Sequence, residues 1–436
     1  MKATPFFLTD VALPTFDVYS DLSLVIGWYW NRHWNFAISM TIPLVLQFLA
    51  TCYKWIQIEK KENKIWSWIP LILQCWPQVR ALRIINLDVK NNTKAKDKKK
   101  ELMREVTSTE PFLEAFPSVM IMTVIWAIAE KDKNFTSYCI ENSEYTECPE
   151  YNNTQLAILN IEYCNQNPDV NRCAVYGGSE GFLWFFTTFF ISVLSCAFGV
   201  VKFLQNGPFA VISSEGPLGG IMTNRFILAF FAVGPSIWVK FGFIYYYCVF
   251  FMQIDNSDQE SKIKSDVLYV SILFGLLVIT NLIFSLVSIG FSTGLNKKFF
   301  EIIASYPAAL MLPMCTFFVI GPRKLSCGSQ VNEQRRHLVL SRGLTIVNMI
   351  LTWIMGVTMV ILDVYHEVEL VMMTGVLLFA TFFHIAFLYP KIKCCGCNFS
   401  ILPGLIFTHT HDIHAIHVSQ NELRPIKIHD LASNDR

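Results

Sequence analysis

Eight apolar runs of about twenty residues constrain the fold of this chain more than any other feature. A helix of roughly that length crosses the hydrocarbon core of a bilayer, where backbone polar groups must be satisfied within the segment itself. The sequence therefore predicts an all-α integral membrane protein rather than a soluble enzyme. The runs lie near residues 11–30, 35–54, 108–130, 181–203, 219–251, 266–291, 340–363 and 368–389.

Two further apolar runs, 65–87 and 299–320, are each interrupted by two prolines. Proline removes a backbone donor and kinks a helix, which is tolerated at membrane depth only where protein or trapped water satisfies the freed carbonyls. We therefore expect two re-entrant helical insertions. The prolines are Pro70, Pro77, Pro307 and Pro313.

Composition agrees with a membrane environment and argues against several functions. Hydrophobic residues make up 53% of the chain and charged residues only 16%, whereas a soluble domain carries about a quarter charged residues. The formal net charge of +1 gives no reason to expect a nucleic-acid partner. The sequence also lacks a Gly-rich phosphate-binding loop. We expect no enzymatic activity, no cofactor and no metal.

Basic residues mark one side of the membrane. They concentrate in the connections 54–64, 90–104, 297–298, 323–342 and 391–393, while the loops 131–180, 253–265 and 365–369 are acidic or neutral. The positive-inside rule assigns the basic side to the cytosol. We therefore expect a multi-pass protein with both termini in the cytosol.

The loop 131–180 carries two kinds of extracytoplasmic signal. It holds four cysteines, for which three disulfide pairings are open, and free thiols are the alternative. It also holds two glycosylation sequons. Both features predict an extracellular loop of a plasma-membrane protein. The cysteines are Cys139, Cys148, Cys164 and Cys173, and the acceptors are Asn134 and Asn152.

The order of these segments indicates an internal duplication. Two spans, an insertion and two more spans are followed by the same order from Gly219. Because each half holds an even number of spans, the two pseudo-repeats would be parallel. The predicted division is a first repeat at 1–204, a second at 205–390 and a cytosolic tail at 391–436.

Charged residues inside the apolar runs are the candidate functional residues. An intramembrane charge is costly, so it normally faces the bundle interior and has a partner. Asp10, Asp17 and Asp21 are spaced by seven and four residues and share one helix face. We expect opposite charges on different helices to pair. They either fix the packing of the helices or line a hydrophilic track. The other candidates are Glu110, Glu114, Arg80, Arg83, Lys202, Arg225 and Lys240.

Several short blocks carry a family resemblance. They are Phe-Asp-Val-Tyr-Ser-Asp-Leu at 16–22, Leu-Gln-Cys-Trp-Pro-Gln-Val-Arg at 73–80, Glu-Pro-Phe-Leu-Glu-Ala-Phe-Pro at 110–117, and Arg225 ahead of an apolar run. In order and spacing these blocks resemble the XK-related family. That family includes caspase-activated phospholipid scramblases and the nematode cell-death scramblase.

The resemblance implies an ATP-independent phospholipid scramblase that exposes phosphatidylserine in apoptosis. Headgroups would move between leaflets along a track of Asp17, Asp21, Arg80, Glu110, Glu114, Lys202 and Arg225. The implied partners are membrane phospholipids, a single-span accessory subunit or lipid-transfer protein, and a second copy of the chain. A solute or ion transporter and a membrane scaffold are the alternative functions. The tail offers no convincing caspase site.

Three cysteines follow the last span directly. Cys394, Cys395 and Cys397 lie beside Lys391 and Lys393, a juxtamembrane setting that suits S-palmitoylation. An unmodified thiol cluster is the alternative. We make no choice between the two from the sequence.

Overall fold

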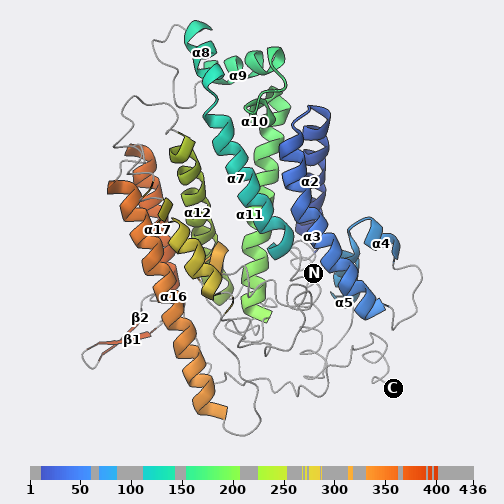
Figure 1. The fold of residues 1–436 in the computed structure, drawn as a ribbon. Helices are drawn as coiled ribbons and strands as arrows, with labels where there is room; N and C mark the ends of the chain where they lie inside the picture. The colour runs from blue at the N-terminus through green and yellow to red at the C-terminus, as the bar shows by residue number, and fades with distance from the viewer. Residues whose placement is uncertain are drawn as a thin grey trace.

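The structure, a computed structural model, is a bundle of long helices with a small disulfide-bonded subdomain at one end (Figure 1). Four of its helices are long and apolar enough to cross a bilayer, as expected of a helical membrane protein. These are Trp34–Ile56, Phe112–Glu130, Gly181–Val201 and Gly343–Ile361. The structure describes residues 11–59, 68–85, 111–142, 154–206, 224–252, parts of 268–286, 313–317, 330–361, 367–388, 391–394 and 397–400.

In the first half, α11 packs against α2, α7 and η3 on one side and exposes apolar residues such as Leu183 and Phe190 on the other. α2 packs against both α3 and α11, and the π-helical turn η3 leads into α7 and also contacts α3 and α11. The outward faces are apolar, as Ile38, Ile42 and Leu49 of α3 illustrate. The elements are α2 (Leu13–Trp30), α3 (Trp34–Glu59), η3 (Pro111–Ala115), α7 (Phe116–Glu130) and α11 (Gly178–Asn206).

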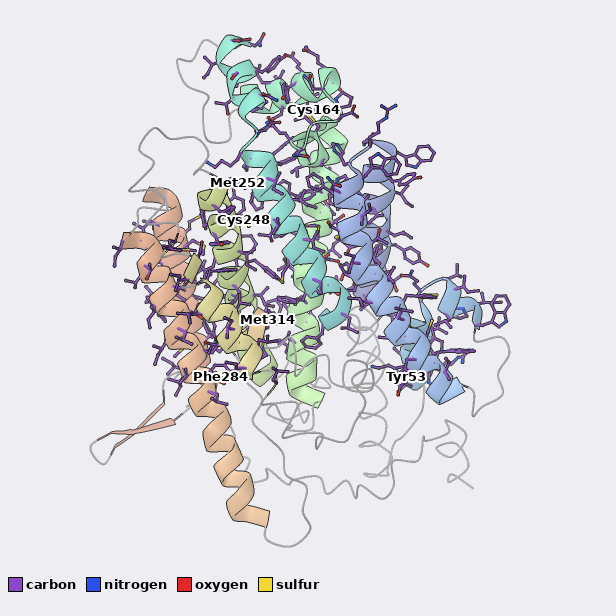
Figure 2. All side chains as sticks on the ribbon, viewed as in Figure 1. Tyr53, Cys164, Cys248, Met252, Phe284 and Met314 are labelled. Carbon is purple, nitrogen blue, oxygen red and sulfur yellow. A yellow bond between two sulfur atoms is a disulfide. The ribbon has the colours of Figure 1, made fainter. Side chains whose placement is uncertain are left out.

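Three long helices form the second half. α12 (Asn224–Met252) lies between α7 and α17 (Glu367–Leu388), and α16 (Gln330–Ile361) packs beside α17. Apolar side chains fill the space between them (Figure 2), including Phe243, Met355 and Leu377. The long helices of both halves lie on seven of the predicted apolar runs, and the run 266–291 contains the shorter helix Phe274–Phe284.

The first proline-interrupted run forms two short helices joined by a tight turn. α4 (Trp68–Ile72) and α5 (Trp76–Ile85) meet at Gln74, whose φ of 55° lies in the left-handed region. Trp76 packs with Phe48 and Trp55 of α3. The Tyr19 hydroxyl of α2 donates a 2.9 Å hydrogen bond to the Leu73 carbonyl. This helical pair is therefore attached to both α2 and α3.

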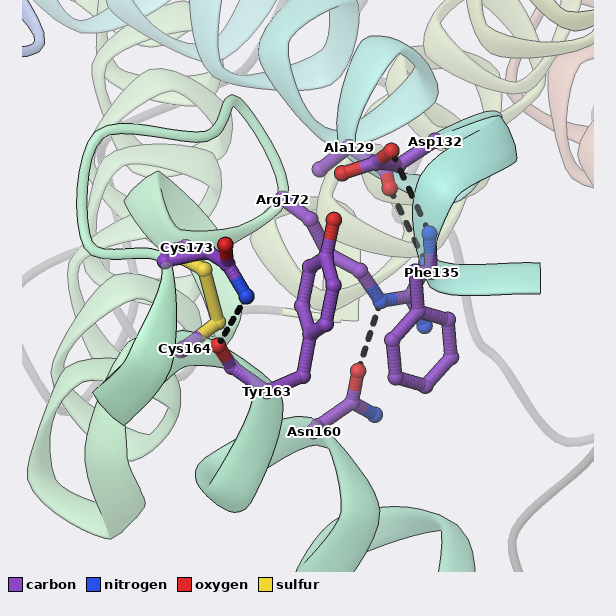
Figure 3. The surroundings of a disulfide bond; sticks show 9 residues. Ala129, Asp132, Phe135, Asn160, Tyr163, Cys164, Arg172 and Cys173 are labelled. Atoms are coloured by element: carbon purple, nitrogen blue, oxygen red, sulfur yellow. Dashed lines mark hydrogen bonds between the residues drawn. A yellow bond between two sulfur atoms is a disulfide. The ribbon is translucent and has the colours of Figure 1, made fainter. Parts of the chain in front are cut away.

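A disulfide closes the subdomain that lies over α7 and α11 (Figure 3). Its helices are α8 (Lys133–Asn142), α9 (Thr154–Gln166) and α10 (Cys173–Tyr176). Of the three pairings left open, the structure forms Cys164–Cys173. Cys139 is also disulfide-bonded, and Cys148 lies outside the described residues.

Arg172 is the centre of this subdomain. Its guanidinium donates to Asn160 Oδ1 at 2.6 Å and to the Ala129 carbonyl at 3.0 Å, and it stacks on Phe135 at 3.7 Å from the ring centroid. The Ala129 contact ties the subdomain to the end of α7. Burial lowers the pKa of Arg172, and Glu130 opposes that shift.

After α17 the chain forms a hairpin, not a helix. β1 (Lys391–Cys394) pairs antiparallel with β2 (Cys397–Ser400), so that Cys394 lies opposite Cys397. Cys395, Asn152 and the tail from 401 onward lie outside the described residues. The predicted palmitoylation therefore stays a prediction.

Candidate functional site

Three carboxylates from two segments of the first half meet inside the bundle. Asp17 and Asp21 lie one turn apart on α2, and Glu114 comes from η3. All three side chains are fully buried, and one carboxylate oxygen of each lies within 4.8 Å of the others. The structure therefore brings together three groups that ionise to the same charge. The sequence had led us to expect pairs of opposite charge.

Hydroxyl groups complete this carboxylate site. Ser192 of α11 donates a hydrogen bond to Asp17 Oδ1 at 2.6 Å, and its Oγ lies 3.4 Å from Asp21 Oδ1. Ser118 lies beside Asp21, one turn after Glu114. The Ser118 side chain is fully buried and faces the Asp21 carboxylate. The site thus contains both carboxylate and hydroxyl oxygen atoms.

Local sequence explains why Glu114 points into the bundle. Pro117 has no backbone N–H and cannot donate to the carbonyl four residues earlier, that of Leu113. The hydrogen-bond ladder changes there from the wider π-helical turn of η3 to the α-helix of α7. Glu114 lies in that wider turn, and both of its neighbours Leu113 and Ala115 are buried. The break therefore places a charged residue on a closely packed segment.

The buried face of α3 changes character along its length. Six of its buried residues repeat at intervals of three and four and form one stripe along the helix. The stripe is apolar near the disulfide-bonded subdomain and polar beyond Leu44. In order it reads Ala37, Met40, Leu44, Gln47, Thr51 and Lys54.

On α2 the core also becomes apolar toward the subdomain. Beyond Asp17 and Asp21, the next buried residues toward the subdomain are Leu24 and Trp28. Trp28 contacts Phe36 and Phe185, with ring centroids 6.0 and 6.3 Å apart. Aromatic side chains therefore close the core between the carboxylate site and the disulfide. On the other side, buried polar residues such as Gln47, Thr51 and Lys54 lie beside apolar ones such as Phe112 and Val200.

Trp28 also connects this aromatic closure to the subdomain. Its indole Nε1 donates a 2.8 Å hydrogen bond to the Ala174 carbonyl, directly after Cys173. The neighbouring Tyr176 hydroxyl donates to Glu130 Oε1 at the end of α7. Burial raises the pKa of Tyr176, and the adjacent Glu130 raises it further. The subdomain is thus joined to both α2 and α7 above the carboxylate site.

Two cations are buried toward the opposite end. Lys54 of α3 is 5% exposed, and Arg80 of α5 is 1% exposed. Both belong to the region where α5 packs on the last turns of α3. Arg80 was expected inside the bundle, and the structure buries it. Lys54 had been assigned only to the cytosolic boundary.

Two predicted cations do not belong to the carboxylate site. Arg83, one turn after Arg80, is exposed on α5 because that face of the short helix has no covering element among the described residues. Lys240 is buried in the second half of the bundle, where its Nζ donates to Asn348 of α16 at 3.1 Å. The structure thus places neither residue beside the three carboxylates, and a role of Arg83 or Lys240 in a lipid path stays a prediction.

The side chains of the remaining charged candidate residues are not among those that the structure describes. Lys202 lies in α11 and Arg225 in α12, but only their backbone positions are described. Asp10 and Glu110 lie outside the described residues. Asn134 is exposed on α8, which is compatible with its use as a glycan acceptor.

Sequence reasoning missed the small polar residues of the site. Thr188, Ser192 and Ser195 follow one another by four and three residues within the apolar run of α11, and all are buried. Ser118 likewise follows Glu114 by four residues. Hydroxyl residues at helical spacing within an apolar run are the sequence signal that indicates such a site.

The arrangement could hold a cation. Three carboxylates repel one another in a buried setting unless protons or a positive ion offset their charge. Carboxylate and hydroxyl oxygens are the ligands that hard divalent cations prefer. The sequence had led to no metal assignment. Asp17, Asp21 and Glu114 are the residues that would bind such an ion.

Comparison of the chain with protein families, characterised proteins and solved structures finds no match in any of the three.

Proposed function

We propose that this chain is a phospholipid scramblase of the XK-related type, in which headgroups pass the membrane along the polar core of the first half. The observation that carries the proposal is the carboxylate site of Asp17, Asp21 and Glu114, buried among helices whose outer faces are apolar. Polar groups at that depth are costly and typically mark a pathway.

The physical argument concerns desolvation. A phospholipid headgroup crosses hydrocarbon slowly because it must lose its water. Carboxylates and hydroxyls such as Ser118 and Ser192 can replace part of that hydration, while the acyl chains stay in lipid. Lys54 and Arg80 place positive charge in the core at the end away from the disulfide, where the phosphate would pass. Such a path requires neither ATP nor covalent chemistry.

The detailed topology belongs to the same proposal. It comprises eight spanning helices and two re-entrant insertions, with both termini in the cytosol and the disulfide-bonded subdomain outside the plasma membrane. The α4–α5 pair, joined at Gln74 and attached to α2 through Tyr19, supports the first insertion. Phosphatidylserine exposure in apoptosis and an accessory subunit follow from the family resemblance alone.

A cation-coupled transporter is the second candidate, because the carboxylate site could bind a cation between helices. A scaffold that recruits a lipid-transfer protein is the third, and only the resemblance supports it. The transporter predicts uptake of a solute that depends on a cation gradient. The scramblase predicts lipid exchange without any gradient.

Reconstitution separates these functions. Purified full-length chain is placed in liposomes that contain a fluorescent phospholipid, and dithionite is added outside. We expect the reduced fraction to rise from about half, the outer leaflet alone, toward completion. Protein-free liposomes prepared in parallel are the control. Protection of the inner leaflet at the same level as in that control would reject the scramblase.

A further inference from the structure

Lys240 of α12 is a buried cation in the second half of the bundle, and only 4% of its surface is exposed. Its Nζ donates one hydrogen bond, to Asn348 Oδ1 at 3.1 Å. Among the described residues no carboxylate lies within ion-pairing distance of it. An ammonium group has three donors. Cys315 of segment 313–317 interacts electrostatically with Lys240. Lys240 therefore keeps donor capacity, and no described carboxylate pairs with it.

Asn348 is held in a fixed orientation by the short segment 313–317. Its Nδ2 lies within hydrogen-bonding distance of the carbonyls of Pro313, Thr316 and Phe317, at 3.3, 3.1 and 3.3 Å. Because these carbonyls can only accept, the amide nitrogen faces them and the amide oxygen faces Lys240. The lysine is thus positioned by an amide that cannot rotate without losing several contacts.

An aromatic ring and a histidine lie close to Lys240 and Asn348. Lys240 Nζ lies 5.9 Å from the centroid of the Phe317 ring, and the same ring lies 4.8 Å from that of His384 on α17. His384 is fully buried. We call the group of Lys240, Asn348, Phe317 and His384 the Lys240 site. It draws on α12, α16, α17 and segment 313–317.

The Lys240 site repeats the spacing of the carboxylate site with the opposite charge. On α12, Ser236 and Lys240 are buried four residues apart, as Asp17 and Asp21 are on α2. On α16, Asn348 and Thr352 are buried four residues apart. Glu114 and Ser118 have that spacing in the first half.

The third helix of each group shows a further parallel. Ser192 of α11 contacts the carbonyl of Thr188, and His384 of α17 contacts that of Ala380, in both cases four residues earlier. Both polar groups thus combine side chains from several helices, with four-residue spacing on each helix. Each half carries one buried polar site, and the charge of the second is positive.

We propose that the Lys240 site binds the phosphate of a phospholipid headgroup. A phosphodiester supplies the negative charge and the acceptor oxygens that Lys240 lacks among the described residues. The inference rests on the proposed function and deepens it, because it names the charged group that the second half of the bundle receives. Inorganic phosphate has the same chemistry, and the experiment separates the two sources.

The test measures binding and not transport. Full-length chain is purified in detergent and incubated with a phosphatidylcholine, with the diacylglycerol of the same acyl chains, or with the phosphatidylcholine plus excess inorganic phosphate. Bound lipid is counted by native mass spectrometry. The variants are Lys240→Met, which removes the charge, and Lys240→Arg, which keeps it. The matched control is Lys131→Gln, an exposed cation in the turn after α7.

We expect wild type to retain phosphatidylcholine and not diacylglycerol. Lys240→Met should weaken retention about tenfold to a hundredfold, the effect of losing about 1.4–2.8 kcal/mol of charge-assisted hydrogen bonding. Lys240→Arg and Lys131→Gln should stay within a few-fold of wild type. Inorganic phosphate should not displace the lipid.

Each other result overturns the proposal. Equal retention by wild type and Lys240→Met, or equal retention of diacylglycerol, would show that Lys240 does not bind the phosphate. Displacement by inorganic phosphate would assign the site to the free anion. A delipidated Lys240→Met protein that melts well below wild type would assign the lysine a structural role. The experiment measures lipid binding and not lipid exchange. Its outcome therefore tests the Lys240 site independently of whether the protein scrambles lipid in liposomes.

Discussion

Ser192 on α11 donates a hydrogen bond of 2.6 Å to Asp17 on α2, and so joins residues 175 positions apart in the sequence. A hydroxyl bonded to a buried carboxylate restrains both helices. Since Glu114 lies in the same cluster, this bond also sets the geometry of the carboxylate site.

Ser192→Ala should destabilise the protein by about 1–3 kcal/mol, because a buried acceptor then loses a donor. Thermal unfolding in detergent measures the effect. Ser39→Ala is the matched control, since the Ser39 hydroxyl is exposed and bonds to a carbonyl of its own helix. Equal melting temperatures for both variants would show that the Ser192 bond contributes nothing.

A divalent cation should raise the melting temperature of wild type through the carboxylate site. Calcium or manganese would bind the folded state and stabilise it by mass action. Glu114→Gln should abolish the increase, because it removes one of three acidic ligands. Glu141→Gln on the exposed end of α8 should leave it intact. An increase that survives in Glu114→Gln would place the cation elsewhere.

Arg172→Lys should destabilise the disulfide-bonded subdomain by about 1–3 kcal/mol. Lysine keeps the charge but cannot contact Asn160 and the Ala129 carbonyl with a planar fork or stack in the same way on Phe135. Hydrogen exchange of α8 and α9 amides reports the loss locally. Protection equal to that of wild type would contradict the central role given to Arg172.

His33, in the turn between α2 and α3, should make stability depend on pH. Burial lowers the pKa of His33 from 6.5, and Asp169 partly opposes this shift. The unfolded state therefore binds the proton more readily, so stability is full above pH 6.5 and falls as the pH drops below it. Melting temperatures at pH 7.5 and 5.5 should differ less in His33→Gln. An unchanged difference would exclude His33 as the cause.

The sequence predicted the helices better than the site. Apolar runs placed α3 and α11 within a few residues because burial in lipid and helix formation require the same pattern. α16 begins at Gln330, well before its apolar run, since polar residues extend a helix beyond the bilayer without any hydropathy signal.

Within the site, the sequence predicted which residues share a helix face, but not which helices pack together. The spacing of Asp17 and Asp21 put them on one face, which the structure confirms. That Glu114 would join them depends on how η3 packs against α2 and α11, which is a tertiary property. The Cys164–Cys173 bond is likewise a matter of three-dimensional proximity, so the sequence left three pairings open.

The rate of phospholipid exchange in liposomes tests the central claim most directly. We predict that wild type exchanges labelled phosphatidylcholine between leaflets, and that the combined Asp17→Asn and Glu114→Gln variant does so at least about tenfold more slowly. Lys131→Gln should exchange lipid at the wild-type rate, and circular dichroism checks that each protein is folded. A folded double variant that exchanges lipid as fast as wild type would contradict the account.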